Sequence, residues 1–275
     1  MKKIVTVLLA LVMCMSMGFI ATGCGQEAET LIVYTEAGFA PFEYISGNDI
    51  VGVDVDIMNL VGKKLGKKVK FENVGFDTIV DTVADGKLCN VGAAGISVTE
   101  ERAEKVAFSK EYYTATLYVI YKKDLKSDYV ATMSDGIEGI TWNKLAGKKI
   151  AVQAGTTADL FLSDEIAEGG VLDGAGATKT DFKKLATAVA DIGLNQDVLI
   201  IDELPAKELI KGNDNLACAP LYYEGGDQDD EPAVDTYAIC VTKGQNEILE
   251  AINAVLEELG TEGIQELVNN HLGIN

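Results

Sequence analysis

The stretch Gly92-Ala93-Ala94-Gly95-Ile96-Ser97-Val98-Thr99-Glu100-Glu101-Arg102 follows a short apolar segment and leads into a charged one. Thr99 has the residue type and position of an N-cap, so we expect a helix to begin at Glu100. The glycines before it carry no Cβ and therefore let a ligand approach the backbone closely. Arg102 then becomes the third helical residue, where the helix dipole disfavours a cation by roughly 0.3–1 kcal/mol unless an anion lies nearby.

This position of Arg102 has two interpretations. In the first, its guanidinium receives an external carboxylate, helped by the Ser97 hydroxyl and by free backbone N–H groups, because the planar fork of an arginine matches a carboxylate in two parallel bonds. In the second, Arg102 is an exposed arginine on a solvated first turn. Glu100 and Glu101 do not satisfy it, since adjacent residues do not face each other across a helix. The stretch alone leaves both interpretations open.

Outward from this stretch, the first half of the chain alternates strand and helix patterns. Asp54 is positioned to cap a helix that ends near Gly66. The other predicted elements are strands at 31–35, 68–72 and 88–93 and a helix at 76–84. Alternation of this kind predicts a mostly parallel sheet, with sites at the carboxyl ends of its strands.

The second half repeats the pattern after a β-rich run at 112–121 and a polar segment at 122–139. A helix is expected to start at Thr156 or Thr157, and Asp202 closes a later strand. The predicted elements are strands at 149–153, 198–201 and 237–242 and helices at 246–259 and 261–267. The chain would cross between two α/β lobes near Tyr113 and near Thr236, and two such crossings form a hinge beside a cleft.

The amino terminus has the pattern of a secretory signal. Two lysines precede an apolar run at 4–20 and small residues before Cys24, a run too short for a confident membrane span. Gly23-Cys24 looks like the lipobox of bacterial lipoproteins. We therefore predict a signal peptide at 1–23, a lipid-anchor linker at 24–30 and lipidation of Cys24. Ordinary cleavage near Ala21 and an uncleaved anchor are the alternatives. In each case the protein works outside the cytoplasmic membrane, lipid-anchored or periplasmic.

Composition excludes several function classes. The formal net charge is −20 without a basic cluster, which argues against a nucleic-acid partner. Cys89, Cys218 and Cys240 have apolar neighbours and are expected to be buried hydrophobes, although the sequence leaves open whether any of them pair. His271 is the sole histidine. We expect no metal and no cofactor.

The motifs together carry a family resemblance over nearly the whole mature chain. They are Phe39-Ala40-Pro41-Phe42-Glu43-Tyr44, Gly52-Val53-Asp54-Val55-Asp56, Gly95 to Arg102, Gly147-Lys148-Lys149-Ile150-Ala151-Val152-Gln153-Ala154-Gly155-Thr156-Thr157 and Asp197-Val198-Leu199-Ile200-Ile201-Asp202. This set resembles the extracytoplasmic solute-binding proteins of polar amino-acid ABC transporters. The resemblance implies a two-lobed Venus-flytrap α/β fold, with two mixed sheets flanked by helices and a two-segment hinge. Lobe 1 would comprise 31–113 plus 238–275, and lobe 2 would comprise 114–237.

The resemblance also implies a ligand site. Arg102, Ser97 and Thr157 would bind the α-carboxylate of a free amino acid, and Asp202 would bind its ammonium group. Phe39 and Phe76 would stack on the ligand side chain. The residues that would line the rest of the pocket are Glu36, Ala94, Gly95, Gln153 and Thr156. The implied partners are the ligand, an ABC permease and, through the lipid, the membrane; the protein would act as a monomer.

Less specific explanations remain for several of these residues. Asp202 has the position of a helix cap for Glu203, and most aromatic residues such as Phe39 and Phe76 lie in a core. A carboxylate at Glu36 between aromatic faces suits a guanidinium or ammonium. We therefore predict arginine or lysine ahead of glutamine, histidine or cystine. An extracytoplasmic enzyme on the same fold, similar to cyclohexadienyl dehydratase, is the alternative; it would need a general acid or base, for which Glu36 or Glu203 are candidates.

Overall fold

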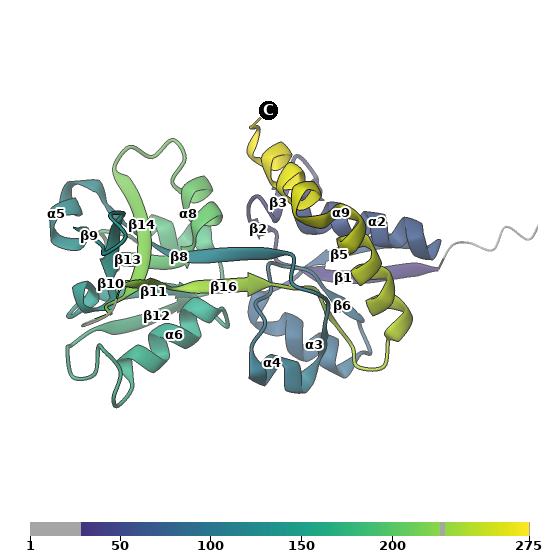
Figure 1. Cartoon of the computed structure of the whole chain (residues 1–275), viewed down its shortest axis with the longest axis horizontal. Coiled ribbons are helices and arrows are strands. Elements are labelled where there is room, and N and C mark those ends of the chain that lie inside the picture. The colour runs from purple at the N-terminus through teal and green to yellow at the C-terminus, as the bar shows by residue number, and fades with distance from the viewer. Residues whose placement is uncertain (1–28, 226–228, 275) are drawn as a thin grey trace, which may run out of the picture.

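The computed structural model describes residues 29–225 and 229–274. The predicted signal peptide, Cys24 and most of the predicted linker lie outside these residues. Figure 1 shows two α/β lobes lying end to end along the long axis of the molecule. Each lobe is built on a mixed sheet, as the family resemblance implies. Among the described residues, no helix combines the length and apolar composition that a membrane crossing requires.

Lobe 1, as we name the half built on the five-stranded sheet, has the strand order β5-β1-β6-β17-β7. Its strands are β1 (Thr30–Thr35), β5 (Lys68–Asn73), β6 (Val91–Gly92), β7 (Ala107–Phe108) and β17 (Cys240–Val241). The first three are parallel, whereas β17 runs antiparallel to β6 and β7. Strand β6 is shorter than predicted: the chain pairs with β1 only at Val91 and Gly92 and then leaves the sheet to form the loop that leads to Ser97.

Helices cover both faces of this sheet, with α2 and α9 on one side and α3 and α4 on the other (Figure 1). Their bounds are α2 (Val53–Leu65), α3 (Ile79–Asp85), α4 (Glu100–Lys105) and α9 (Asn246–Leu272), and a 3-10 turn, η1 (Phe76–Thr78), precedes α3. Gly260 has a non-helical backbone (φ 58°) inside α9, at the predicted break between the two closing helices. A small sheet of β2 (Gly38–Phe39), β3 (Glu43–Ser46) and β4 (Asp49–Val51) completes the lobe.

The start of α2 corrects a prediction. Gly52, not Asp54, is the N-cap, and no side chain caps this helix. Gly52 has φ 140°, and a Cβ there would lie 2.0 Å from the Phe42 carbonyl oxygen. At the same place, Asp54 N donates a hydrogen bond to the Phe42 carbonyl oxygen at 3.0 Å. The backbone geometry therefore requires glycine at the cap, which leaves the Asp54 carboxylate free to bind elsewhere.

Lobe 2 is built on the nine-stranded sheet, with the order β12-β11-β13-β8-β14-β10-β9, β15 beside β14 and β16 beside β8. Its strands are β8 (Tyr113–Lys122), β9 (Ala131–Thr132), β10 (Glu138–Thr141), β11 (Lys149–Gln153), β12 (Thr178–Phe182), β13 (Val198–Asp202), β14 (Leu216–Tyr223), β15 (Glu231–Pro232) and β16 (Val234–Tyr237). Its helices are α5 (Lys126–Tyr129), α6 (Thr157–Ile166), α7 (Leu185–Ala190) and α8 (Glu203–Leu209), with 3-10 turns η2 (Lys123–Leu125) and η3 (Trp142–Leu145).

Two strands join the lobes, and they pair with each other. Strand β16 is antiparallel to β8, with Tyr237 opposite Tyr113 and Val234 opposite Thr116. Figure 1 shows both strands running from one lobe to the other. Because the two crossings form one hydrogen-bonded ribbon, we expect rotation of the lobes to bend the ribbon as a unit.

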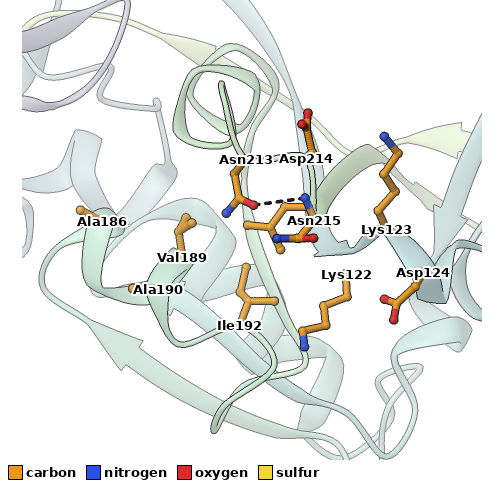
Figure 2. A pocket seen from close by; sticks show the side chains of 11 residues that line it. Lys122, Lys123, Asp124, Ala186, Val189, Ala190, Ile192, Asn213, Asp214 and Asn215 are labelled. Carbon is orange, nitrogen blue, oxygen red and sulfur yellow. Dashed lines mark hydrogen bonds between the residues drawn. The ribbon is translucent and has the colours of Figure 1, made fainter.

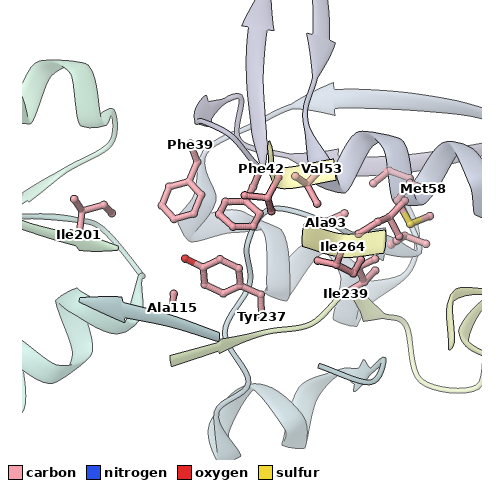
Figure 3. Close-up of a cluster of buried hydrophobic side chains, with 14 of the residues drawn as sticks. Phe39, Phe42, Val53, Met58, Ala93, Ala115, Ile201, Tyr237, Ile239 and Ile264 are labelled. Carbon is pink, nitrogen blue, oxygen red and sulfur yellow. The ribbon is translucent and has the colours of Figure 1, made fainter. Parts of the chain in front are cut away.

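Aromatic packing fills the region where this ribbon meets lobe 1. The Phe42 ring lies 5.0 Å from Tyr237 and 4.9 Å from Tyr113, measured between ring centroids. Figure 3 shows Phe39 and Phe42 next to Tyr237, with Ile201 of lobe 2 on the far side. A separate core around Trp142 and two tyrosines fills lobe 2. The main core therefore continues from lobe 1 through the hinge into lobe 2, where it includes Leu199, Ala206 and Leu216.

The three described cysteines are free thiols. Cys89 and Cys240 are buried, and both belong to the lobe 1 core, as predicted. Cys218 is only half-buried. His271 bonds Asp56 at 2.9 Å and Tyr44 at 3.2 Å, so its two ring nitrogens both hold α9 against the start of α2 and β3.

Replacing Gly52 with alanine tests the geometry at the start of α2. The added methyl meets backbone that cannot rotate away, and the positive φ adds strain of roughly 1–2 kcal/mol, so we expect a loss of about 3–5 kcal/mol in the free energy of unfolding. Urea denaturation measures the loss. Gly47→Ala is the matched control, because Gly47 has φ 64° and an added methyl there would have nothing within 4 Å; it should lose only about 1–2 kcal/mol. Equal losses in both variants would contradict the close contact at Gly52.

Candidate ligand-binding site

Arg102 lies at the contact between the two lobes. Only 8% of its surface is exposed. Its Nη1 donates to the Ser97 carbonyl at 2.7 Å in lobe 1, and its Nη2 donates to the Gly155 carbonyl at 2.7 Å in lobe 2. The interpretation of Arg102 as an exposed surface residue is therefore wrong.

Helix α4 holds Arg102 in this place. Thr99 is its N-cap as predicted, and the Thr99 hydroxyl accepts from Arg102 N at 3.2 Å. The guanidinium carbon lies 5.7 Å from the centroid of the Phe76 ring, within the range of a cation–π interaction. Burial lowers the pKa of Arg102, and nearby acids, Asp235 first, oppose this effect. Phe76 therefore contacts the cation of the site; its predicted stacking on a ligand stays a prediction.

Lobe 2 presents the beginning of α6 to Arg102. Thr156 is the N-cap: its hydroxyl accepts from Asp159 N at 3.3 Å and donates to the Gln153 carbonyl at 2.8 Å. Thr157, one residue on, is buried and turns toward lobe 1, where its Oγ1 lies 3.3 Å from Ser97 Oγ. The positive end of the helix dipole thus lies beside the residues predicted to bind a carboxylate.

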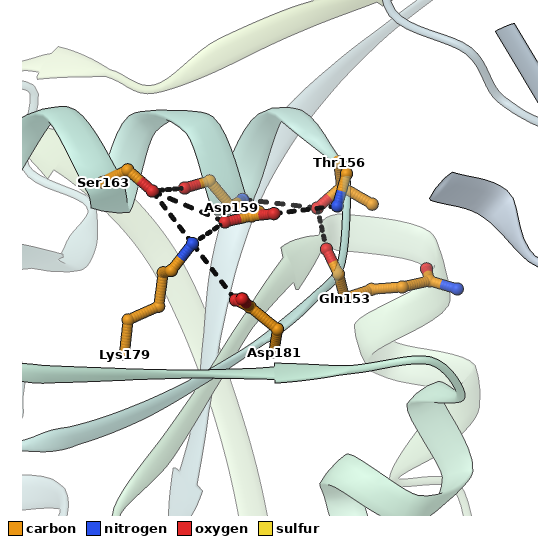
Figure 4. A network of polar contacts seen from close by, with 7 residues as sticks. Gln153, Thr156, Asp159, Ser163, Lys179 and Asp181 are labelled. Carbon is orange, nitrogen blue, oxygen red and sulfur yellow. Dashed lines mark hydrogen bonds and ion pairs between the residues drawn. The ribbon is translucent and has the colours of Figure 1, made fainter. Parts of the chain in front are cut away.

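A polar network fixes the turn before α6 (Figure 4). Asp159 accepts from Gly155 N at 2.8 Å and forms an ion pair with Lys179, which also pairs with Asp181 at 3.1 Å. Gly155 has φ 77°, and a Cβ there would lie 3.1 Å from Asp77 Cα of lobe 1. This turn therefore needs glycine both for its backbone angle and for the close approach of the lobes.

Glu36 and Gln153 make another contact between the lobes. Gln153 Nε2 donates to Glu36 Oε2 at 3.3 Å, and both side chains are buried. Burial raises the pKa of Glu36, while the bonds from Gln153 and Gly38 and the charge of Lys184 lower it. Glu36 is thus a desolvated acid for which the described contacts supply only partial compensation.

Asp202 ends β13 at the same contact region. It is the N-cap residue of α8, but its side chain makes no capping hydrogen bond, so capping does not explain the aspartate. Its Oδ1 is buried without a hydrogen-bond partner in the described part of the chain. Burial and the charge of Asp235 raise the pKa of Asp202 to about 7. Asp202 is therefore a buried acid that a cation would stabilise.

The loop that carries Ala94 and Gly95 is held from behind by α2. Gly95 N donates to Asp54 Oδ2 at 3.0 Å, and the Tyr112 hydroxyl donates to Asp54 Oδ1 at 2.5 Å. Burial raises the pKa of Asp54 to about 6, against these two bonds. Gly95 has φ 53°, and a Cβ there would lie 2.8 Å from Phe39 Cε1. Phe39 thus packs on the glycine as well as on the core.

The structure brings together residues that sequence reasoning missed. These are the Gly155 carbonyl, Asp54 as an anchor for Gly95, and Asp235 on the hinge strand. The acidic run that ends at Asp235 is typical of a loop, yet Asp235 and Tyr237 alternate with more exposed residues and so have the period of a strand. That period is the signal that could have found Asp235. No local pattern indicates that Asp54 reaches a residue 41 positions away.

A cavity of about 770 Å³ lies elsewhere, in lobe 2 beside α7 and the start of β14 (Figure 2). Lys122, Asn213 and Asn215 are among its lining residues, and none of the predicted site residues is. We place the candidate site between the lobes instead, because the buried charges and the bonds across the two halves meet there. In the described residues, no group of three or more His, Cys, Asp and Glu side chains is placed to hold a metal ion.

Fold and site together define an extracellular solute-binding protein. The family model of bacterial extracellular solute-binding proteins, family 3, matches residues 31–274, and the chain belongs to that family. Among curated relatives it is 28% identical over 254 residues to the arginine-binding extracellular protein ArtP of Bacillus subtilis, with 89% of each chain covered.

Solved structures give the same result. The amino acid ABC transporter substrate-binding protein AbpA of Streptococcus pneumoniae, solved with L-arginine bound, superposes with a TM-score of 0.74 at 26% identity, covering 89% of this chain and 95% of that one. An ancestral arginine-binding protein bound to glutamine superposes with a TM-score of 0.70 at 28% identity, covering 89% and 98%. The two-lobed periplasmic-binding-protein fold expected from the sequence is confirmed.

Asp202→Asn tests whether the buried acid costs stability. A pKa raised from 3.8 to about 7 corresponds to an upper limit of roughly 4 kcal/mol at pH values where the acid is ionised. Because the folded protein holds the proton more tightly than the unfolded one, this cost is full above pH 7 and declines as the pH falls toward 4. We therefore expect the variant to be more stable than wild type by about 1–4 kcal/mol at pH 8, with a smaller gain at pH 5.

Urea denaturation at the two pH values measures this difference in the protein without ligand. Asp214→Asn is the control, since Asp214 is exposed; it should change stability little at either pH. A loss of stability in Asp202→Asn at pH 8 would contradict the assignment of Asp202 as a buried acid whose ionised form is unfavourable in the folded chain.

Proposed function

We propose that this protein captures a free basic amino acid, with arginine or lysine as the preferred ligands, and delivers it to the permease of an ABC importer. The observation that carries the proposal is the placement of opposite charges at one contact region, with the Arg102 guanidinium on lobe 1 and the Asp202 carboxylate on lobe 2, both buried. A free amino acid carries a carboxylate and an ammonium group, so it can form an ion pair with Arg102 and another with Asp202 at the same time.

The head group would bind at residues that already lie together. Arg102, Ser97 and Thr157 are connected across the lobes, and the start of α6 adds its positive dipole end. We assign the α-carboxylate to this group and the ammonium to Asp202. Phe39, Ala94, Gly95, Gln153 and Thr156 remain our proposed lining.

Glu36 supports a cationic side chain. It is a second buried acid on the lobe contact, and its raised pKa reflects missing compensation. A guanidinium or ammonium would supply that compensation through a charge-assisted bond. The names of two similar proteins agree with a basic ligand: ArtP is an arginine-binding protein, and AbpA was solved with L-arginine. Glutamine, histidine and cystine follow as weaker candidates.

Closure of the lobes would couple binding to transport. A ligand favours the closed form only by the contacts it gains there. Arg102 and Glu36 already bond lobe 2 directly, so a ligand between them would add its own bonds to both lobes. The closed pair of lobes would then be the form that the permease receives.

Location and assembly complete the proposal. We infer secretion by a signal peptide at 1–23, lipidation of Cys24, tethering through 24–30 outside the membrane, and action as a monomer. The lobe boundaries, 31–113 with 238–275 and 114–237, are supported by the start of β8 at Tyr113 and the end of β16 at Tyr237. No observed contact favours the dehydratase-like alternative among the described residues.

Arg102→Ala tests the head-group site. Removal of one partner from a buried charge pair costs about 2–5 kcal/mol, so titration calorimetry with L-arginine should show a loss of that size. Arg102→Lys should recover only part of it, because an ammonium cannot reproduce the planar fork. Lys105→Ala, on the exposed side of the same helix, is the control and should bind normally. Wild-type affinity in Arg102→Ala would refute the site.

Glu36→Gln tests ligand preference. Citrulline has nearly the shape of arginine but a neutral side chain, so wild type should bind arginine about ten- to hundredfold more tightly, the range expected of a charge-assisted bond. In Glu36→Gln this ratio should fall toward one. Glu72→Gln is the control, since Glu72 is partly exposed and its charge is already paired with Lys70. Equal binding of arginine and citrulline by wild type would contradict the role of Glu36.

A further inference from the structure

Asp235 lies on the hinge strand β16 and turns toward the lobe contact. It is 8% exposed and sits opposite Ala115 of β8. Thr157 Oγ1 donates to Asp235 Oδ2. The charged and titratable groups around Asp235 are Arg102, Asp202 and Tyr237. Asp235 thus lies outside the proposed ligand lining, yet it contacts Thr157, one of the residues that we assign to the ligand carboxylate.

The protons of the hydroxyl groups can be counted. A carboxylate only accepts, and a hydroxyl has a single proton to donate. Since Thr157 gives its proton to Asp235, it has none left for Ser97, whose Oγ lies 3.3 Å from Thr157 Oγ1 and also within reach of the Asp235 carboxylate. Ser97 therefore donates either to Asp235 itself or to Thr157, and in both cases the two hydroxyl protons serve Asp235.

A carboxylate from outside needs these same protons. If Ser97 and Thr157 are to donate to a ligand, Thr157 must leave Asp235 or the Asp235 charge must be neutralised. Asp235 also lies close enough to Arg102 for the two charges to attract each other. It therefore engages the same three side chains that a ligand carboxylate would engage, namely the guanidinium of Arg102 and the hydroxyls of Ser97 and Thr157, the last at the beginning of α6.

We propose that Asp235 is an internal competitor for the ligand carboxylate and thereby sets the affinity of the site. This inference rests on the proposed function, because it takes Arg102, Ser97 and Thr157 as the head-group site. Binding would exchange an internal carboxylate for an external one of the same chemistry, so part of the binding energy is spent on displacing Asp235. In the alternative role, Asp235 would bind the ligand ammonium together with Asp202. Neutralising Asp235 would then weaken ligand binding instead of strengthening it.

Asp235→Asn distinguishes the two roles, with L-arginine and agmatine as probes in titration calorimetry. Agmatine is arginine without its carboxylate, so it has nothing to exchange with Asp235. As a competitor, Asp235 must weaken arginine binding specifically. We therefore expect arginine to bind at least about threefold more tightly to the variant, while agmatine binds equally or more weakly. Asp202→Asn is the matched acid and should weaken both ligands.

A double-mutant cycle adds a second readout. In a Thr157→Val background the hydroxyl that connects Asp235 to the site is gone, so the gain from Asp235→Asn should shrink. Thermal unfolding confirms that each variant is folded, and Asp235→Ser replaces Asp235→Asn if the latter is not. Weaker arginine binding in the Asp235 variant, or equal shifts for arginine and agmatine, would overturn the competitor role.

Failure of the proposed function has a different signature. In that case wild type would bind no amino acid of the twenty in a thermal-shift screen. If wild type instead prefers an amino acid other than arginine, the comparison uses that amino acid and its decarboxylated amine, and the same two outcomes decide the role of Asp235.

Discussion

The buried guanidinium of Arg102 is the group on which the arrangement of the two lobes depends. A cation at 8% exposure is stable only if its donors are used, since an unpaired buried charge costs several kcal/mol. One donor is satisfied by the loop in its own lobe and another by the Gly155 carbonyl of the other lobe. Lobe 1 alone therefore satisfies only part of the Arg102 guanidinium, and the Gly155 carbonyl of lobe 2 accepts a further hydrogen bond from it.

The scaffold around this cation uses different devices in each lobe. In lobe 1 a threonine cap fixes the helix that bears Arg102, and Asp54 fixes the glycine loop in front of it. In lobe 2 a lysine held by two aspartates supports the turn at Gly155. These supports are rigid elements, and a site whose donors are pre-positioned loses less entropy on binding.

Buried acids make the site suitable for a cation and also lower the stability of the folded protein. Burial raises the pKa values of Glu36, Asp54, Asp202 and Asp235, which means that their ionised forms are unfavourable in the folded chain. A protein selected for stability alone would replace such groups. Glu36, Asp202 and Asp235 are buried where the lobes meet. On our proposal, a cationic ligand offsets the cost of Glu36 and Asp202, and Asp235 competes with the ligand carboxylate at the same site.

The sequence by itself determined the features that arise from neighbours along the chain. Thr99 caps a helix three residues before Arg102, strands alternate with helices in both lobes, and Gly260 breaks the final helix. Cap and period patterns act over a few residues, so they can be recognised locally. The family motifs extended this to the set of expected ligand contacts.

Only the tertiary structure decided which distant groups meet. It assigned the cap of α2 to Gly52 because of a contact with Phe42, and it gave Asp54 to Gly95, 41 residues away. It also placed Asp235 of the hinge strand on Thr157, 78 residues away. Such contacts depend on how strands are ordered in a sheet and how two lobes are oriented, and no period in the chain encodes them.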